Sequence, residues 1–164
     1  MTVGRSWSRN KPISQEHKVA DLSQPFWQQK TMMEMDEKEW ESLCDHCGRC
    51  CLHKFEDEQE TIHYTNVVCR LYAHDGRGCG DYQARQTLVR DCLRLQQLDH
   101  KQFRWLPESC AYRLLSEGKT LPLWHPLRSG NATSVANAGM TIAGRVVRES
   151  DVDDLESHII SWVQ

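Results

Sequence analysis

The chain has 164 residues, enough for one domain with a modest core, and carries 20 basic against 23 acidic side chains. This near balance gives no reason to expect nucleic acid or an anionic membrane as a partner. No apolar run approaches the roughly 20 residues of a membrane span, and the N-terminus lacks the apolar segment of a signal peptide. We therefore expect a cytoplasmic protein. In that reducing compartment, eight cysteines favour metal ligation over disulfides.

The N-terminal part divides into a tail and the start of a domain. Residues 1–20 are polar and follow neither apolar period, so we predict a flexible tail followed by one domain over residues 21–164. Residues 25–27 (PFW) indicate a short helix. Asp36 with Glu39 three residues later is a capping-box pattern, and it predicts a helix that runs into the first cysteine of the chain.

The stretch from Cys44 to Cys51 (CDHCGRCC) holds four cysteines within eight residues. Core packing does not explain this density, because Leu or Val would serve equally well. Two Cys-x-x-Cys steps in series let a tight loop aim three sulfurs at one point, and Gly48 eases the turn. Neighbouring side chains diverge on an extended backbone, so we expect Cys51 to reach a second metal or to support the first, apart from Cys50.

The segment after this cluster is expected to form a connector, a strand and a loop. Residues 53–60 (HKFEDEQE) are polar and acidic, and the alternation in residues 61–69 predicts a strand that ends at Cys69. The glycines of residues 70–82 indicate a loop that returns Cys79 to the side of Cys69.

The next segment contains the last two cysteines. Residues 84–98, which include Cys92, fit one face of a helix and a short strand equally well, so they stay unassigned. Pro107 marks the start of a helix that ends at Gly118. Cys110 would lie in the first turn of this helix, where backbone N–H groups favour a thiolate.

The C-terminal part is expected to be a loop, a strand and a helix. Residues 119–139 are rich in Pro, Gly and small polar side chains, which indicates a long surface connection, and residues 140–147 look like a short strand. Ser150 and Asp153 can cap a last helix. Its apolar stripe would consist of Val152, Leu155, Ile159 and Val163. The predicted fold class is therefore α+β, a small single domain of short helices and a few strands organised around a cysteine metal cluster.

The cysteines fit either zinc or iron. A structural zinc ion takes four thiolate or imidazole ligands, so eight cysteines allow two such sites, with pairs that the sequence does not assign. The triple Cys-x-x-Cys step is also how bacterial ferredoxins hold iron–sulfur clusters, although their run continues to a Cys-Pro that is missing here. Cys92 and Cys110 fit a buried small side chain equally well, and His46 and His53 are interpreted as surface histidines. The metal-ligand candidates are Cys44, Cys47, Cys50, Cys51, Cys69, Cys79, Cys92 and Cys110.

These motifs resemble those of the largely uncharacterised bacterial CxxCxxCC family, which is described as a zinc- or iron-chelating domain. The resemblance runs from about Pro25 to the C-terminal segment. It rests on LCDHCGRCCLHK, TNVVCRLY, the step from Cys79 to Tyr82, and WLPESCAYRLLSEGKTLPLWHPL. It implies the same eight cysteines as ligands. The chain departs from the pattern at Arg77, where related sequences often have another cysteine.

The expected function is a metal-binding protein that holds zinc or an iron–sulfur cluster through its clustered cysteines. The alternatives are an iron–sulfur redox enzyme and, because the wider family includes flagellin lysine methylases, a methyltransferase component that depends on a partner. An adaptor that a metal keeps folded for an unidentified protein partner is a third hypothesis. No residue of the sequence is predicted to be catalytic.

Overall fold

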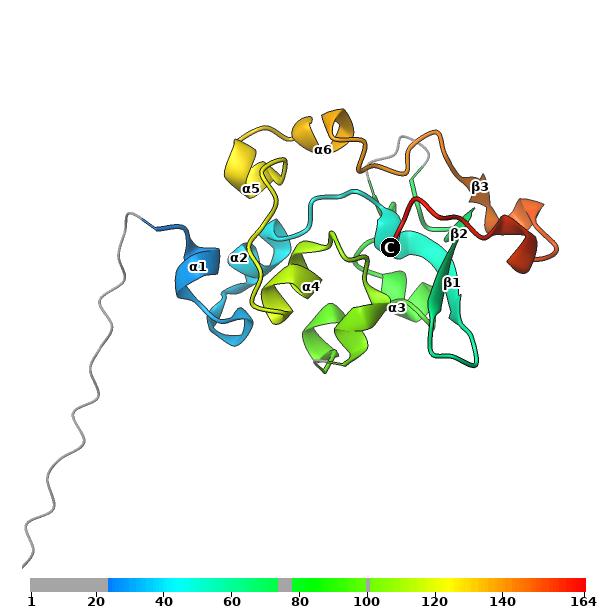
Figure 1. The fold of residues 1–164 in the computed structure, drawn as a ribbon, viewed down its shortest axis with the longest axis horizontal. Helices are drawn as coiled ribbons and strands as arrows, with labels where there is room; N and C mark the ends of the chain where they lie inside the picture. The colour runs from blue at the N-terminus through cyan, green and yellow to red at the C-terminus, as the bar shows by residue number, and fades with distance from the viewer. Residues whose placement is uncertain (1–23, 74–77, 100) are drawn as a thin grey trace, which may run out of the picture.

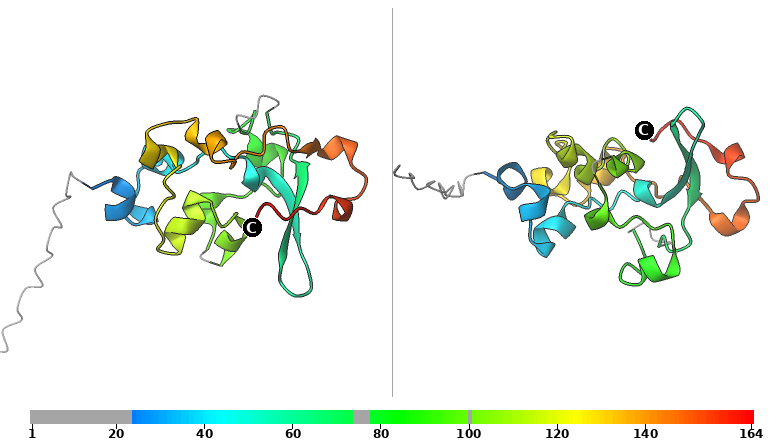
Figure 2. Two further views of the ribbon diagram at one scale, coloured as in Figure 1. Left: turned by 45° about the horizontal axis from the view of Figure 1, so that its top comes forward. Right: turned by 90° about the horizontal axis from the view of Figure 1, so that it is seen from below.

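The computed structural model describes residues 24–73, 78–99 and 101–164, and these form a small α+β domain. The helices are α1 (Phe26–Gln29), α2 (Glu37–Ser42), α3 (Arg85–Leu88), α4 (Ala111–Ser116), α5 (Pro126–Ser129) and α6 (Ser134–Asn137); the strands are β1 (Leu52–Glu56), β2 (Ile62–Val68) and β3 (Val147–Arg148). Most helices gather at one end and the sheet lies at the other (Figures 1 and 2). The predicted fold class is confirmed. The predicted tail and Arg77 lie outside the described residues.

Short-range sequence patterns correctly predict the first two helices. The helix α1 begins at Phe26, directly after Pro25, as predicted. At α2, the Asp36 side chain accepts a hydrogen bond from the backbone N–H of Glu39 at 2.9 Å, and the Glu39 carboxylate accepts one from the N–H of Asp36 at 2.9 Å. This is the predicted capping box.

The sheet has the order β1-β2-β3. The strands β1 and β2 are antiparallel, with Leu52 opposite Val68, whereas β2 and β3 are parallel. The predicted strand that ends before Cys69 is confirmed as β2. The interpretation of residues 53–60 as a connector is wrong in part. The residues up to Glu56 pair with β2 and belong to β1.

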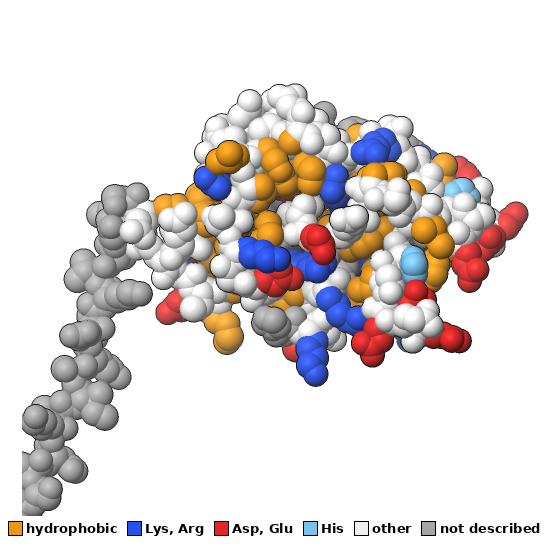
Figure 3. All heavy atoms as spheres, viewed as in Figure 1, with side chains coloured by type: hydrophobic (Ala, Val, Ile, Leu, Met, Phe, Trp, Pro, Cys, Tyr) orange, Lys and Arg blue, Asp and Glu red, His pale blue; other side chains and the backbone are white. Residues whose placement is uncertain are grey.

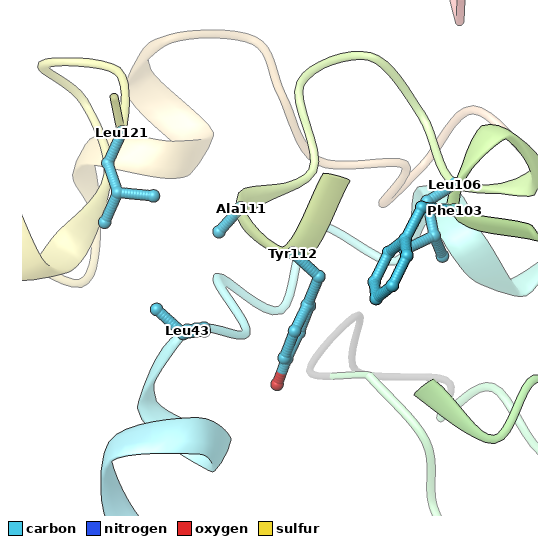
Figure 4. Close-up of a cluster of buried hydrophobic side chains, with 6 residues drawn as sticks. All are labelled: Leu43, Phe103, Leu106, Ala111, Tyr112 and Leu121. Carbon is cyan, nitrogen blue, oxygen red and sulfur yellow. The ribbon is translucent and has the colours of Figure 1, made fainter. Parts of the chain in front are cut away.

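Two groups of buried side chains form the core. The first, here the helix-side cluster, consists of Leu43, Phe103, Leu106, Ala111, Tyr112 and Leu121. Figure 4 shows its side chains coming from segments on several sides of the ring of Tyr112, whose hydroxyl donates to the carbonyl of Trp40 at 2.9 Å. The second, here the sheet-side cluster, consists of Leu52, Tyr64, Val68, Ile142 and Val163. The 3-10 helix η2 (Arg49–Cys51) runs directly into β1 and so joins the two clusters.

The middle segments follow the sequence in part. The helix α4 begins at Ala111 rather than at Pro107, with Cys110 as its N-cap, and it ends before Gly118, whose φ is +70°. The unassigned residues 84–98 contain α3 and the 3-10 helix η3 (Leu95–Gln97).

The expected surface connection over residues 119–139 is wrong. The helices α5 and α6 lie within it, and Leu121, His125 and Val135 are buried. Pro126 starts α5 because its fixed φ suits the first helical position. The small polar residues of this segment therefore lie in helix caps and turns between its buried side chains.

The predicted C-terminal strand and helix are largely wrong. Only Val147 of residues 140–147 belongs to β3. The expected last helix is replaced by the short 3-10 helices η5 (Glu149–Asp151) and η6 (Glu156–His158). The N–H of Ile160 donates to the carbonyl of Tyr64 at 2.9 Å, so this end of the chain runs extended beside β2. Pairing with the sheet outweighs the helical period, and Ile159 of the expected stripe is 47% exposed.

The surface shows the balance of charge that the composition predicts. On the face shown in Figure 3, Lys and Arg side chains are interspersed with Asp and Glu side chains. No helix among the described residues has the length and apolar character that crossing a membrane requires.

Candidate metal centre

The cysteine-rich loop lies between the two buried clusters. Cys44 follows α2 and donates its N–H to the carbonyl of Glu41 at 3.2 Å. Gly48 has a φ of +80° and precedes η2, which carries Cys50 and Cys51. Cys50 packs against the helix-side cluster and Cys51 against the sheet-side cluster. The two neighbouring cysteines therefore belong to different halves of the core.

The extended backbone that was assumed for Cys50 and Cys51 is wrong, because this segment is a 3-10 turn. Cys51 is the main influence that lowers the pKa of Cys50, and Cys50 is the main influence that raises the pKa of Cys51. The two thiols therefore interact, although the residues pack against different clusters.

Four further cysteines come back to this loop from distant parts of the sequence. Cys69 follows β2 and donates its N–H to the carbonyl of Cys51 at 3.0 Å. Cys79 pairs with Tyr72 in an antiparallel bridge, which confirms that the chain returns it to the side of Cys69. Cys110, at the start of α4, packs against the helix-side cluster with Cys44 and Cys50. All eight thiols are free of disulfides.

A cavity of about 310 Å³ opens beside the cysteine-rich loop. Four of the eight cysteines line it: Cys50, Cys51, Cys69 and Cys92. Lys54, Tyr82, Arg85 and Trp105 are among its other lining residues. The cavity therefore places Cys92 among the other thiols, although the sequence favoured a ligand and a buried small side chain equally.

Backbone N–H groups just after several cysteines favour the thiolate form. They lower the pKa of Cys44 through His46, of Cys47 through Arg49, of Cys69 through Leu71, and of Cys110 through Arg113 and Tyr112. A backbone N–H near a sulfur stabilises its charged form. The turns that follow these cysteines therefore support a thiolate.

Burial opposes this effect. It raises the pKa of Cys44 to about 12, and it raises the pKa values of Cys47 and Cys110 as well. At Cys110, the expected contribution of the helix N-terminus is present as hydrogen bonds from backbone N–H groups, but burial exceeds it. These thiols therefore hold their protons at neutral pH unless a positive charge joins them.

Two cations near the thiols, the half-buried Lys54 and the buried Arg49, were not expected from the sequence. The Lys54 ammonium donates to the carbonyls of Cys50 at 3.0 Å and Leu52 at 3.4 Å. Burial lowers its pKa, and the charges of nearby cysteines raise it. Arg49, which is 7% exposed, donates its Nε–H to the carbonyl of Met140 at 2.8 Å. The only sequence signal was that Arg49 lies between cysteines of the loop and Lys54 three residues after the last of them.

The histidines lie around this site in different ways. His53 Nε2 lies 2.7 Å from a carboxylate oxygen of Glu149, on the partly exposed side of β1. His125 is fully buried, and its Nε2 is 3.1 Å from the carbonyl of Leu43, directly before the first cysteine. His125 is thus a structural neighbour of the loop that the sequence did not single out.

The sulfurs are neighbours without forming a coordination shell. Within residues 24–73, 78–99 and 101–164, no three Cys, His, Asp or Glu side chains are grouped so that they could hold one metal ion as they stand. Ligation of a metal would therefore involve side-chain rotation, for which cysteine has three staggered rotamers.

The sequence is similar to bacterial proteins over most of its length. A UPF0260 protein of Vibrio cholerae is 49% identical over 140 residues, which cover 85% of this chain and 97% of that protein. A UPF0260 protein of Cellvibrio japonicus is 52% identical over 141 residues, covering 84% and 96%. One of Gluconacetobacter diazotrophicus is 50% identical over 139 residues, covering 84% and 87%. No protein-family model matches the sequence, and no solved structure matches it.

Proposed function

Because the chain belongs to the UPF0260 family, whose names state no activity, we propose its function from the thiols: it binds zinc or iron through its clustered cysteines. The proposed ligands are Cys44, Cys47, Cys50, Cys51, Cys69, Cys79, Cys92 and Cys110. Such thiophilic ions suit a reducing compartment, where cysteines stay available as thiols.

The observation that carries this proposal is the convergence of cysteines from distant segments. Cys50, Cys51, Cys69 and Cys92 line one cavity, and Cys44 and Cys110 pack with Cys50 against the helix-side cluster. A cysteine that only fills space in a core needs no other thiols around it. Backbone N–H groups also lower the thiol pKa values of Cys44, Cys47, Cys69 and Cys110, which suits thiolate ligands.

A metal in this position would serve the fold. The candidate ligands come from the cysteine-rich loop, the end of β2, the segment after α3 and the start of α4, so an ion would tie together segments that pack on both buried clusters. An all-cysteine set resembles closed structural sites, which leave no ligand position open. We therefore favour a structural metal in a domain that presents its surface to a protein partner.

The test is metal content and visible absorption of the full chain, purified without air. The proposal expects stoichiometric zinc in colourless protein, or iron with sulfide in brown protein. The variant with both Cys44→Ser and Cys47→Ser should bind less metal per chain than the wild-type protein. Met33→Ser is the matched control, because it exchanges a sulfur for a hydroxyl at a position that is 96% exposed. Folded protein without stoichiometric metal, or a metal content that is unchanged from wild type in both variants, would overturn the proposal.

A further inference from the structure

The eight cysteines lie in two neighbourhoods that meet at one peptide bond. We infer that they form two separate four-thiol metal sites, divided between Cys50 and Cys51, an inference that rests on the proposed metal binding. Site one consists of Cys44, Cys47, Cys50 and Cys110. Site two consists of Cys51, Cys69, Cys79 and Cys92.

The members of site one share the helix-side cluster. Cys44, Cys50 and Cys110 all pack against it, although Cys110 is far away in the sequence. Cys47 is 8% exposed and lies between Cys44 and Cys50 in the loop, where its carbonyl accepts the N–H of Ile142 at 3.0 Å. This anchor and the positive φ of Gly48 turn the loop between Cys47 and Cys50, while Cys110 caps α4 beside the helix-side cluster.

The members of site two share the open end of the β1–β2 pair. Cys51 directly precedes β1 and Cys69 directly follows β2, and the backbone hydrogen bond between them holds the two residues side by side. The N–H of Tyr72 donates to the carbonyl of Cys69 at 2.9 Å, and Tyr72 bridges to Cys79. Cys92 completes the set from the segment after α3, because it lines the same cavity as Cys51 and Cys69, which Cys50 borders from site one.

Lys54 lies at this boundary. It lines the same cavity as Cys50 of site one and Cys51 and Cys92 of site two, and its ammonium donates to the carbonyl of Cys50. Four thiolates around a divalent ion carry a net charge of about −2, so two adjacent sites repel each other. A cation between them reduces that repulsion, which makes two neighbouring sites physically compatible.

The experiment counts the zinc ions bound to the wild-type full chain, to two single variants that each alter one site, and to the double variant. Wild-type protein should bind two ions, Cys110→Ser and Cys69→Ser one each, and the double variant none, with circular dichroism to confirm folding. Wild-type protein that binds one ion, or either single variant that loses both ions, would overturn the two-site assignment and leave metal binding intact. Folded wild-type protein without zinc or iron would instead overturn the proposed function, and the inference with it.

A second measurement keeps the inference testable if a variant does not fold. Wild-type protein is loaded with one equivalent of zinc and alkylated, and the modified cysteines are located by mass spectrometry of its peptides. The inference expects the cysteines of one site to be protected together, before those of the other. Protection that develops equally across both sets, or that follows a different grouping, would overturn it.

Discussion

Gly48 and the side chain of Ile142 lie so close together that only a hydrogen fits between them. A Cβ on Gly48 would come 2.8 Å from Cγ1 of Ile142 and 2.7 Å from the ring of Tyr72. Such distances are shorter than non-bonded carbon contacts allow. The φ of +80° at Gly48 adds a conformation that other residues rarely adopt. The C-terminal segment therefore holds the cysteine-rich loop in place by direct contact.

This contact predicts a large cost for Gly48→Ala. Left-handed backbone costs about 1–2 kcal/mol for a residue with a Cβ, and overpacking adds typically about 1–3 kcal/mol. We expect the free energy of unfolding, measured in urea at a fixed zinc concentration, to fall by about 2–5 kcal/mol. Gly144→Ala is the control, because Gly144 has a φ of +73° and open space at its Cβ position. An equal loss in both variants would show that the contact contributes nothing.

A second tie to the same segment is the guanidinium of Arg49. Its Nε donates to the carbonyl of Met140 and one Nη to the carbonyl of Gly139 at 3.3 Å. Arg49→Met should lower the free energy of unfolding by about 2 kcal/mol, because hydrogen bonds from a charged donor contribute about 1.5–3 kcal/mol. Arg104→Met is the control, since that side chain is 41% exposed in its ion pair with Glu56 and surface pairs contribute about 0–1 kcal/mol. A change at Arg49 no greater than at Arg104 would contradict this role.

The parts of the fold that the sequence predicted correctly depend on short-range signals. The capping box of α2 involves two residues three positions apart, and the alternation of Ile62 and Tyr64 marks β2 by itself. The C-terminal helix failed because the hydrogen bond from Ile160 to Tyr64 joins residues that are distant in the sequence. A helical period in a single sequence cannot show that a neighbouring strand will pair with the segment instead.

For the candidate site, spacing identified the cysteines but not their surroundings. The density of thiols between Cys44 and Cys51 was visible in the sequence, as was the return of Cys79 to Cys69. The packing of Cys50 and Cys51 against different clusters was not, because it depends on a 3-10 turn between these clusters. Lys54 was missed for a similar reason, since its ammonium lies beside the cysteine-rich loop by donating back to the carbonyl of Cys50.

His125 should make stability dependent on pH. Its Nδ1 accepts the N–H of Leu127 at 3.2 Å, so its hydrogen lies on Nε2, which donates to the carbonyl of Leu43. A second proton would face the N–H of Leu127. Burial lowers the pKa of His125, against smaller effects of Leu43 and Asp45 that raise it.

The sign of this effect follows from proton linkage. The unfolded chain takes up a proton at His125 near pH 6.5, before the folded protein does, so stability is full above about pH 6.5 and falls as the pH drops toward the folded-state pKa. His125→Gln should lose this part of the pH dependence in urea unfolding between about pH 7 and 5. If His125→Gln kept the wild-type profile, another group would be responsible for it.

Lys54 should determine how tightly the thiols hold a metal. Its ammonium is the cation that responds to cysteines of both proposed sites, and thiolates form more readily beside a positive charge. Lys54→Met keeps the length and apolar character of the side chain but removes the charge. We expect zinc affinity at pH 7, measured by competition with a chelator, to fall about tenfold or more, which corresponds to about 1.4 kcal/mol.

The pH dependence separates this electrostatic role from a packing role. Without Lys54 the thiols give up their protons less readily, so the loss of affinity should shrink as the pH rises from 7 to 9 and proton competition weakens. A packing defect would cost the same affinity at both pH values. Lys30→Met is the matched control, because Lys30 pairs with Glu39 at the surface and its removal should leave zinc affinity unchanged. Equal zinc affinities of the Lys54 and Lys30 variants would show that the ammonium of Lys54 does not stabilise the thiolates.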